Sequence, residues 1–438
     1  MRYVFLNNFR GFSETLIPLQ SVNFLVGENS TGKTSFLKIV NLLSQVQFWF
    51  SPAHTLQEEA GLGSFDDMVS AWSGDRSRFQ IGSIELHEAG DGVWDSLAFV
   101  FTFSERAGAP HLSRALHCRD GRLTRVVFRG NATKFKNTEV LGGPKSESLA
   151  LEEFLDAARE ELTVARGYTR LAEGKVLESL PLPMLIEFVR NMKGSKEIGG
   201  MPIPSIEFQG RIPFAVGDLA CIGPIRARPQ RFYSEAWRRF SPEGDHTPFL
   251  IKTQLLATKR AAQFARQLKA FGEASGLFET VVSRNFGDDN RSPFELLVRF
   301  KNGDINISNV GYGVPQVLPL IVEFLSRNRG GYFAVEQPEV HLHPRAQAAL
   351  GEFVFSLATE RRHRFVMETH SDYLIDRFRL CLSRHANPPK SQVVFFERIA
   401  AGNRATPMQI NSEGRYPDDQ PASFRDFFIK EEMQLLGI

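Results

Sequence analysis

Residues 21–43 read SVNFLVGENSTGKTSFLKIVNLL, in the order strand, glycine-rich loop and helix. Within this segment, Gly27-x-x-x-x-Gly32-Lys33-Thr34 matches the phosphate-loop pattern completely. A chance glycine turn is the alternative interpretation. The apolar strand before the loop and the periodic helix Phe36–Leu43 after it favour a true phosphate loop. The segment therefore predicts a site for the phosphates of a nucleotide.

The residue types of the loop suit this chemistry. Backbone N–H groups of such a loop face the β-phosphate, a lysine reaches the β- and γ-phosphates, and a hydroxyl can ligate Mg²⁺. Lys33 and Thr34 occupy the lysine and hydroxyl positions. The candidate nucleotide-binding residues are Gly27, Asn29, Ser30, Thr31, Gly32, Lys33, Thr34 and Ser35, with Thr34 also a candidate Mg²⁺ ligand.

A phosphate loop needs a carboxylate at the end of a neighbouring buried strand to hold the magnesium. The apolar run Tyr332–Val335 predicts such a strand, and Glu336 follows it directly. Because about 300 residues separate Lys33 from Glu336, both ends of the chain must contribute to one nucleotide site. The middle of the chain must then be an insertion.

Three further segments extend the pattern. They are Ser308-Asn309-Val310-Gly311-Tyr312-Gly313, Gln337-Pro338-Glu339-Val340-His341-Leu342-His343-Pro344 and Glu368-Thr369-His370-Ser371. With the phosphate loop and these segments in this order along the sequence, the chain resembles the ABC-type ATPases of the Rad50, SMC and overcoming-lysogenization-defect group. It looks most like the stand-alone members with a DUF3696-like C-terminal region, through these segments and Gly223-Pro224-Ile225-Arg226-x-x-Pro229.

The resemblance implies ATP as the nucleotide and a role for each motif. Glu336 would support the magnesium, and His370 would sense the γ-phosphate. The loop with Ser308, Gly311 and Gly313 would cover the γ-phosphate of the opposite subunit, and Val340–Pro344 would lie at the dimer seam. Such a site is completed when two subunits enclose two ATP molecules, so we expect a homodimer or a higher even-numbered oligomer.

The chain departs from most relatives at Gln337, where they have the glutamate that polarises the attacking water. A glutamine can orient water but cannot accept its proton, so we expect slow hydrolysis unless Glu339 or His370 acts as the base. Glutamine also positions water in some efficient GTPases. The Gln-Pro-Glu form looks natural in this subgroup, which favours a natural residue over an engineered one.

Two other groups of residues have competing interpretations. His341 and His343, with Glu339 nearby, could bind a metal, but such a cluster is more often a hydrogen-bonded turn, and the family offers a role at the dimer seam. Arg10 could contact the nucleotide from the loop after the first strand, or it could be a surface arginine.

The middle of the chain holds the only local basic bias, at residues 226–269. Its members are Arg226, Arg228, Arg231, Arg238, Arg239, Lys252, Lys259, Arg260, Arg266 and Lys269, interleaved with Phe232, Tyr233, Trp237 and Phe240. Arginine with aromatic residues suits phosphate contacts and base stacking, so this segment is a candidate DNA or RNA surface. A solvated helix face is the alternative, and Glu235 and Glu243 dilute the positive field.

Composition limits the remaining possibilities. The 438 residues include 52 Lys+Arg against 50 Asp+Glu, 42% hydrophobic residues and 3 Cys. This excludes a disordered or polybasic chain, and three scattered cysteines favour neither a disulfide framework nor a zinc site. We find neither a signal-peptide pattern nor an apolar run of membrane length, so we expect a cytoplasmic protein without a membrane partner.

The alternation of strands and helices predicts an α/β fold: an ABC-type P-loop ATPase head with a mixed β lobe and a parallel α/β lobe. We expect the head at residues 1–140 and 272–438, with antiparallel strands between about 79 and 129, and a mainly helical insertion at 141–271. The last fifteen residues are predicted to form a docked amphipathic helix.

Three classes of function compete. The first is an ATP-dependent switch that closes a head-to-head dimer, hydrolyses slowly and controls a separate effector. In relatives this role often belongs to prokaryotic defence against phage or mobile DNA. The second is a DNA repair or processing ATPase stimulated by nucleic acid. The third, a transporter ATPase subunit, is disfavoured because residues 308–313, which stand in the place of the family's signature loop, lack Leu-Ser-Gly-Gly-Gln.

Overall fold

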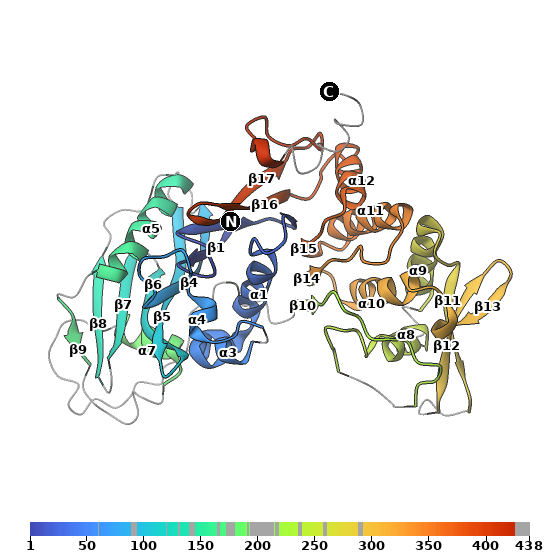
Figure 1. The fold of residues 1–438 in the computed structure, drawn as a ribbon, viewed down its shortest axis with the longest axis horizontal. Coiled ribbons are helices and arrows are strands. Elements are labelled where there is room, and N and C mark those ends of the chain that lie inside the picture. Colours follow the sequence, from blue (N-terminus) through green and yellow to red (C-terminus); the bar gives the residue numbers. More distant parts are fainter. Residues whose placement is uncertain are drawn as a thin grey trace. The chain divides into compact units, whose positions relative to one another are not determined.

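A computed structural model gives the fold of the chain (Figure 1). It describes residues 1–59, 61–88, 94–119, 121–129, 132–139, 144, 146–163, 167–171, 180–190, 192, 214, 219–234, 239–256, 261–287 and 292–424. The chain divides into two compact units. The first unit contains Met1–Leu19, Glu28–Gly217 and Phe396–Thr406, and the second contains Gln20–Gly27, Asp218–Phe395 and Pro407–Ile438. One of the boundaries falls between Gly27 and Glu28, where the phosphate loop begins.

The first unit is built on an eight-stranded sheet of order β2-β1-β4-β5-β6-β7-β8-β9. All neighbouring strands in it are antiparallel. Its elements are β1 (Arg2–Asn7), β2 (Thr15–Leu19), α1 (Lys33–Ser44), α2 (Val46–Phe50), α3 (Pro52–Glu58), α4 (Phe65–Met68), β4 (Arg78–Glu88), β5 (Trp94–Arg106), β6 (Ala109–Arg119), β7 (Arg122–Arg129), β8 (Ala132–Glu139), α5 (Glu147–Thr163), β9 (Thr169–Arg170) and α7 (Leu182–Arg190).

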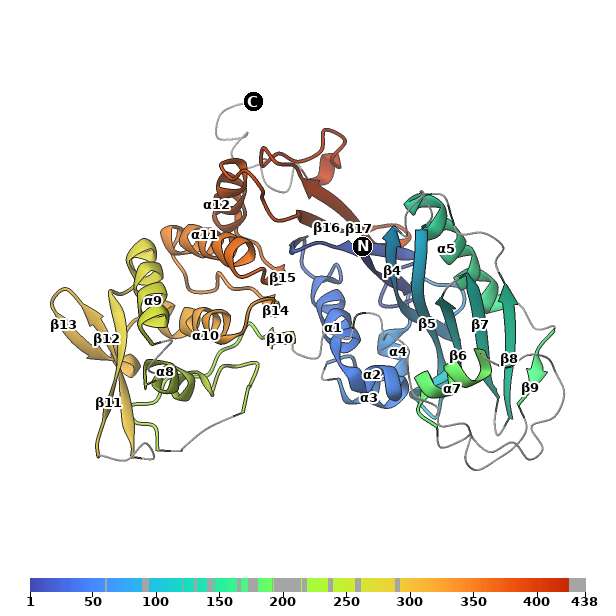
Figure 2. The same ribbon diagram turned by 180° about the vertical axis from the view of Figure 1, so that it is seen from behind.

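The two-residue period of β5 gives this sheet two different apolar faces. Ala98 and Val100 point to one face, where they pack with Phe154 of α5. Phe99 and Phe101 point to the other face and contact the ring of Trp49 in α2, with centroids 5.4 and 5.7 Å away. Helix α5 can be followed along this sheet in Figure 1, and α7 crosses it in the reverse view of Figure 2.

The second unit holds a six-stranded sheet of order β10-β14-β15-β3-β16-β17 and a three-stranded sheet of order β11-β12-β13. The first four strands of the larger sheet run parallel. The elements are β3 (Val22–Gly27), β10 (Leu219–Ile222), α8 (Thr247–Leu256), α9 (Ala261–Ser275), β11 (Thr280–Asn285), β12 (Phe294–Phe300), β13 (Gly303–Asn306), η1 (Ile307–Asn309), α10 (Gly313–Ser326), β14 (Tyr332–Glu336), α11 (Pro344–Glu360), β15 (Arg364–Glu368) and α12 (Asp372–Ser383). Strands β16 (Ser391–Ile399) and β17 (Gly402–Ile410) pass through both units.

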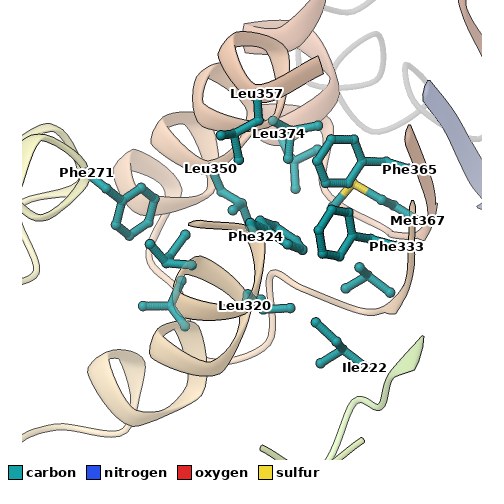
Figure 3. Close-up of a cluster of buried hydrophobic side chains, with 14 of the residues drawn as sticks. Ile222, Phe271, Leu320, Phe324, Phe333, Leu350, Leu357, Phe365, Met367 and Leu374 are labelled. Carbon is teal, nitrogen blue, oxygen red and sulfur yellow. The ribbon is translucent and has the colours of Figure 1, made fainter. Parts of the chain in front are cut away.

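Strands and helices of the second unit share one continuous apolar core (Figure 3). Phe333 and Phe365 stack on neighbouring strands with ring centroids 5.2 Å apart, and Phe324 of α10 packs edge-on against Phe333 at 4.7 Å. Leu350 of α11 and Leu374 of α12 complete the cluster in this view. This packing fixes the carboxyl ends of β14 and β15 relative to each other.

The predicted α/β class is confirmed, and the period-two segments do form antiparallel strands. Within the predicted insertion, β10 joins the six-stranded sheet and α5 covers the eight-stranded one, so described parts of residues 141–271 pack into both units. The division into head and insertion stays a prediction. The predicted C-terminal helix lies outside the described residues, apart from the buried Phe424.

Candidate nucleotide site

The phosphate loop has the backbone geometry that its glycines predict. Ser30 and Gly32 have φ of 62° and 99°, both left-handed, and α1 begins immediately after Gly32. The Lys33 side chain is only 3% exposed, and its ammonium donates a hydrogen bond of 2.6 Å to the Glu28 carbonyl. The Thr31 hydroxyl donates to the same carbonyl at 2.8 Å. The lysine is thus folded back over the loop, at the amino end of a helix, where anions are favoured.

The buried ring of Phe12 leaves no room for a side chain at Gly32. A Cβ atom at this position would lie 2.5 Å from Cζ of Phe12, whose ring packs against Phe396 at 6.0 Å. Asn403 lies against the same position, because its Nδ2 would be 3.3 Å from that Cβ, and Nδ2 donates to the Arg10 carbonyl at 2.9 Å. Glycine is therefore required at residue 32 both for its backbone angle and for lack of room.

Arg10 is held by its own unit rather than solvated. Its guanidinium donates to the Ser35 hydroxyl at 3.1 Å, and to the carbonyls of Gly61 at 3.0 Å and Leu62 at 2.7 Å. Burial lowers the pKa of Arg10 from its ordinary value. The link to Ser35 joins this half-buried arginine to the first turn of α1, and the contact with the nucleotide stays a prediction.

In the second unit, two carboxylates end adjacent parallel strands. Glu336 is the last residue of β14 and pairs in register with Glu368, the last residue of β15. Glu368 in turn pairs with Leu25 of β3, two residues before Gly27. The carboxyl ends of these three strands meet at one sheet edge, the place where open α/β sheets bind ligands. The phosphate loop starts at this edge because it is covalently continuous with β3.

The turn after β14 is fixed by backbone and side-chain hydrogen bonds. The Gln337 N–H donates to the Glu368 carbonyl at 2.8 Å, and Gln337 has a left-handed φ of 43°. The Glu339 carboxylate accepts from the Thr369 hydroxyl at 2.8 Å and from the His370 N–H at 2.7 Å. Burial raises the pKa of Glu339, and these hydrogen bonds oppose that rise. Both Glu339 oxygens therefore tie the turn to Thr369 and His370.

Arg226 is buried, whereas the sequence predicted that it belongs to a DNA or RNA surface. Its side chain is 3% exposed, and its Nη2 donates to the Glu336 carbonyl at 3.3 Å. Burial lowers the pKa of Arg226 to about 10, while Glu339 and Glu336 oppose this shift. Its Nε and Nη1 have no hydrogen-bond partner among the described residues. Arg226 is therefore a buried cation that contacts the end of β14 at Glu336, and it is not part of a nucleic-acid surface.

The histidines take separate positions. His343 caps α11 by accepting from the Ala346 N–H, His341 and His370 are exposed, and the His341 ring lies 5.8 Å from that of Tyr312. Within the described ranges, no group of three His, Cys, Asp or Glu side chains could hold a metal ion. This favours the hydrogen-bonded turn over a histidine metal site.

The predicted signature loop lies beside this turn. Asn306 accepts from the Ser308 N–H at 3.0 Å and from the Ser308 hydroxyl at 2.8 Å, which shapes the loop before α10. A Cβ on Gly313 would lie 3.1 Å from the His341 carbonyl oxygen. Tyr312 is 69% exposed between them. The loop and the turn 337–343 therefore form one continuous surface of the second unit.

The basic segment is divided between core and surface. Besides Arg226, Lys252 is buried, with its ammonium 4.6 Å from the centre of the Phe294 ring. Arg228, Arg231, Arg239, Arg266 and Lys269 are exposed, whereas Arg238, Trp237, Lys259 and Arg260 lie outside the described residues. Any nucleic-acid surface must therefore be smaller than the sequence indicates.

Two family models match the chain. Residues 1–87 match the AAA ATPase domain, and residues 225–376 match the model described as "AAA domain, putative AbiEii toxin, Type IV TA system". The first match contains the phosphate loop, and the second contains Glu336, the turn after it and His370. Both matches are to ATPase domain models, and each covers less than half of the chain.

Similar solved structures are distant. An SMC head bound to the C-terminal winged-helix domain of ScpA is 10% identical with a TM-score of 0.42, covering 93% of this chain and 97% of that chain. The SMC head domain from Thermotoga maritima is 11% identical with a TM-score of 0.38, covering 93% and 99%. The recombination mediator RecF is 10% identical with a TM-score of 0.30, covering 92% and 97%. No curated protein matches the chain.

A search of the described residues for membrane spans finds no helix that combines the length and the apolar character needed to cross a bilayer.

Proposed function

We propose that this chain is a switch ATPase that binds Mg-ATP on the loop 27–35, dimerises head to head and hydrolyses ATP slowly. The phosphate loop carries this proposal: left-handed Ser30 and Gly32, and a buried Lys33 held at the amino end of α1. The strand that leads into the loop, β3, belongs to the same parallel sheet as β14, which ends in Glu336.

The oxygen ligands of this chain suit magnesium. Thr34 lies in the first turn of α1, and Glu336 is the last residue of β14. Mg²⁺ prefers a few hydroxyl or carboxylate oxygens of this kind together with phosphate oxygens. When bound, the ion would neutralise charge on the β- and γ-phosphates. Lys33 would contact the same phosphates, and Ser30, Thr31 and Gly32 would present backbone N–H groups.

Slow turnover follows from Gln337. Its amide can orient a water molecule, but it cannot take the proton that a glutamate takes in most relatives. A slow ATPase stays closed for long periods after binding ATP, which suits a switch. By resemblance to stand-alone relatives, the closed state would control a separate effector in prokaryotic defence against phage or mobile DNA.

The dimer is supported by the exposed surface around Tyr312, because the signature loop and the turn 337–343 lie together there. Aromatic side chains at the centre of an interface contribute much of its binding energy. Tyr312→Ala should weaken the ATP-dependent dimer, measured as the mass in light scattering with and without Mg-ATP. Phe286→Ala is the matched control, because Phe286 is also exposed but lies at the end of β11. Equal masses for wild type in both conditions, at the monomer value, would contradict dimerisation.

One observation favours a second candidate, an ATPase stimulated by nucleic acid. Phe232 and Phe286 are each 50% exposed and their ring centroids lie 5.3 Å apart. Arg231 lies over the first ring and Arg284 over the second, each at 5.8 Å. Exposed rings with arginines can stack bases and contact phosphates. The candidate predicts that single-stranded DNA or RNA raises phosphate release, and that Phe232→Ala with Phe286→Ala removes this effect.

A further inference from the structure

A cavity within the first unit is lined mainly by polar side chains. Its volume is about 600 Å³, within the range of small-molecule sites. The ends of β4, β5, β6 and β7 surround it together with α4, and all its described lining residues belong to this one unit. Four serine or threonine residues contribute to the lining. Its charged members are Arg76, Arg78, Arg114, Arg129, Asp66 and Glu105.

The register of the strands places three of these arginines on one face of the sheet. Arg78 of β4 lies opposite Ser104 of β5, and Arg114 of β6 lies opposite Thr102, two residues earlier on β5. Arg114 also pairs with β7, at the residue two places before Arg129. Directly paired residues of an antiparallel sheet project to the same face, as do residues two apart along a strand. The three guanidinium groups therefore project toward the same space.

The C-terminal end of α5 lies against two of these arginines. Arg78 donates through Nη1 to the Leu162 carbonyl at 2.9 Å, and Arg114 donates through Nη1 to the Glu161 carbonyl. Arg78 also donates through Nε to the Asp75 carboxylate at 2.9 Å. Because a guanidinium has five N–H donors, these two contacts fix Arg78 and leave donors for a ligand.

The positive charge of the cavity is only partly neutralised. Arg76 and Asp66 pair at 3.8 Å, but both side chains are more than half exposed, so solvent weakens the pair. The Glu161 carboxyl lies 3.8 Å from Arg114, and burial raises the pKa of Glu161 to about 7. Glu161 is therefore only partly charged near neutral pH. An oxygen of Glu105 accepts a backbone N–H of the turn after β5.

Arginine suits phosphate, because its planar group can donate two parallel hydrogen bonds to phosphate oxygens. The cavity is also much larger than one phosphate ion needs, since even a water molecule occupies only about 30 Å³ in the liquid. We propose that the cavity binds a small phosphate ester, with its phosphate on the arginines and its organic part in the remaining space.

This second site goes beyond the proposed ATPase function. No residue of the phosphate loop 27–35 is among the described residues that line the cavity. Binding of the ester therefore needs neither ATP nor its hydrolysis, and it can be measured by itself.

The test is calorimetry of the purified chain with three probes: inorganic phosphate, AMP and adenosine. We expect one AMP to bind per chain, at least about tenfold more tightly than adenosine, because hydrogen bonds from arginine to the charged phosphate carry the affinity. AMP should also bind more tightly than inorganic phosphate. Absence of saturable AMP binding up to about 1 mM would overturn the proposal. Adenosine that binds as tightly as AMP, or phosphate that does so, would overturn it too.

Two exposed arginines of the cavity can be replaced with little risk to the fold. Arg76→Gln combined with Arg129→Gln should weaken AMP binding at least about tenfold while the melting temperature stays close to that of wild type. Arg106→Gln is the matched control, because Arg106 is an exposed arginine that ends β5 but is not among the lining residues. It should keep the wild-type AMP affinity. Unchanged AMP affinity in the double variant would refute the assignment.

Lys33→Ala separates this cavity from the phosphate loop. The proposal predicts equal AMP affinities for wild type and Lys33→Ala, whereas a tenfold loss would place AMP on the loop and overturn the cavity site. Since no hydrolysis is measured, a chain that releases no phosphate from ATP would end the proposed function and leave this proposal intact. Single-stranded DNA binding that the double arginine variant weakens, without AMP binding, would assign these arginines to nucleic acid instead and overturn the proposal.

Discussion

Gly32→Ala is the substitution whose effect the structure defines most closely. The change adds one methyl group at a residue with φ of 99°, a left-handed angle that alanine adopts only with strain. The new Cβ would meet Cζ and Cε2 of Phe12 at 2.5 and 2.7 Å, well inside ordinary contact distance. Phe12 is fully buried against Phe396, so its ring cannot move away freely.

The cost has two parts. The backbone angle contributes about 1–2 kcal/mol, and forcing a methyl group into a packed site adds about 1–3 kcal/mol. Gly32→Ala should therefore lower the free energy of unfolding by about 2–5 kcal/mol. Gly108→Ala is the control for the first part, because Gly108 has φ of 79° and nothing lies within 4 Å of its added Cβ. It should cost only about 1–2 kcal/mol.

A double substitution isolates the second part. Leucine has no atoms in place of Phe12 Cζ and Cε2, so Phe12→Leu removes the clash at the expense of about 1–2 kcal/mol of packing. In urea unfolding, the double variant should be more stable than the two single effects predict, by about 1–3 kcal/mol. Single effects that add within about 0.5 kcal/mol would refute the steric argument.

Two other predictions concern charge. Lys33→Ala should weaken ATP binding in calorimetry by at least about tenfold, since a charged hydrogen bond to phosphate is worth about 1.5–3 kcal/mol. Lys38→Ala, on the same helix, should leave the ATP affinity unchanged. Equal ATP affinities of the two variants would contradict the loop assignment. Burial raises the pKa of Glu161 to about 7, above its ordinary 4.5, although Arg114 and Arg125 oppose the rise. The contribution of Glu161 to stability is therefore complete below about pH 4.5 and is lost as the pH rises through 7. The free energy of unfolding of Glu161→Gln, relative to wild type, should rise by up to about 3 kcal/mol between pH 4.5 and 8. Melting temperatures of the two proteins that change in parallel with pH would contradict this.

Local sequence signals predicted the parts of the fold that depend on local patterns. The phosphate loop follows from its glycines, and the strand Tyr332–Val335 and its terminal Glu336 follow from an apolar run that ends in a charge. The period-two residues of β4 and β5 likewise indicated antiparallel pairing. β2, a short edge strand, was missed because Pro18 within it cannot donate a backbone hydrogen bond and so argues against a strand.

Residue positions that depend on tertiary packing could not be predicted from these local sequence signals. Arg226 looks like a surface arginine in a basic run, and only the pairing of β10 with β14 brings it behind the acidic turn. Glu368 is one carboxylate among many in the sequence, and its register with Glu336 appears only once the strands are paired. The available signal for Glu368 was its place at the end of an apolar strand, the same signal that identified Glu336.

The most direct test of the proposed function is phosphate release from Mg-ATP by the purified chain, with Lys33→Ala as the blank. We expect slow release that clearly exceeds the blank, because ATP binds and Gln337 can orient water but cannot accept its proton. Equal release by wild type and Lys33→Ala would contradict the central claim that this chain hydrolyses ATP.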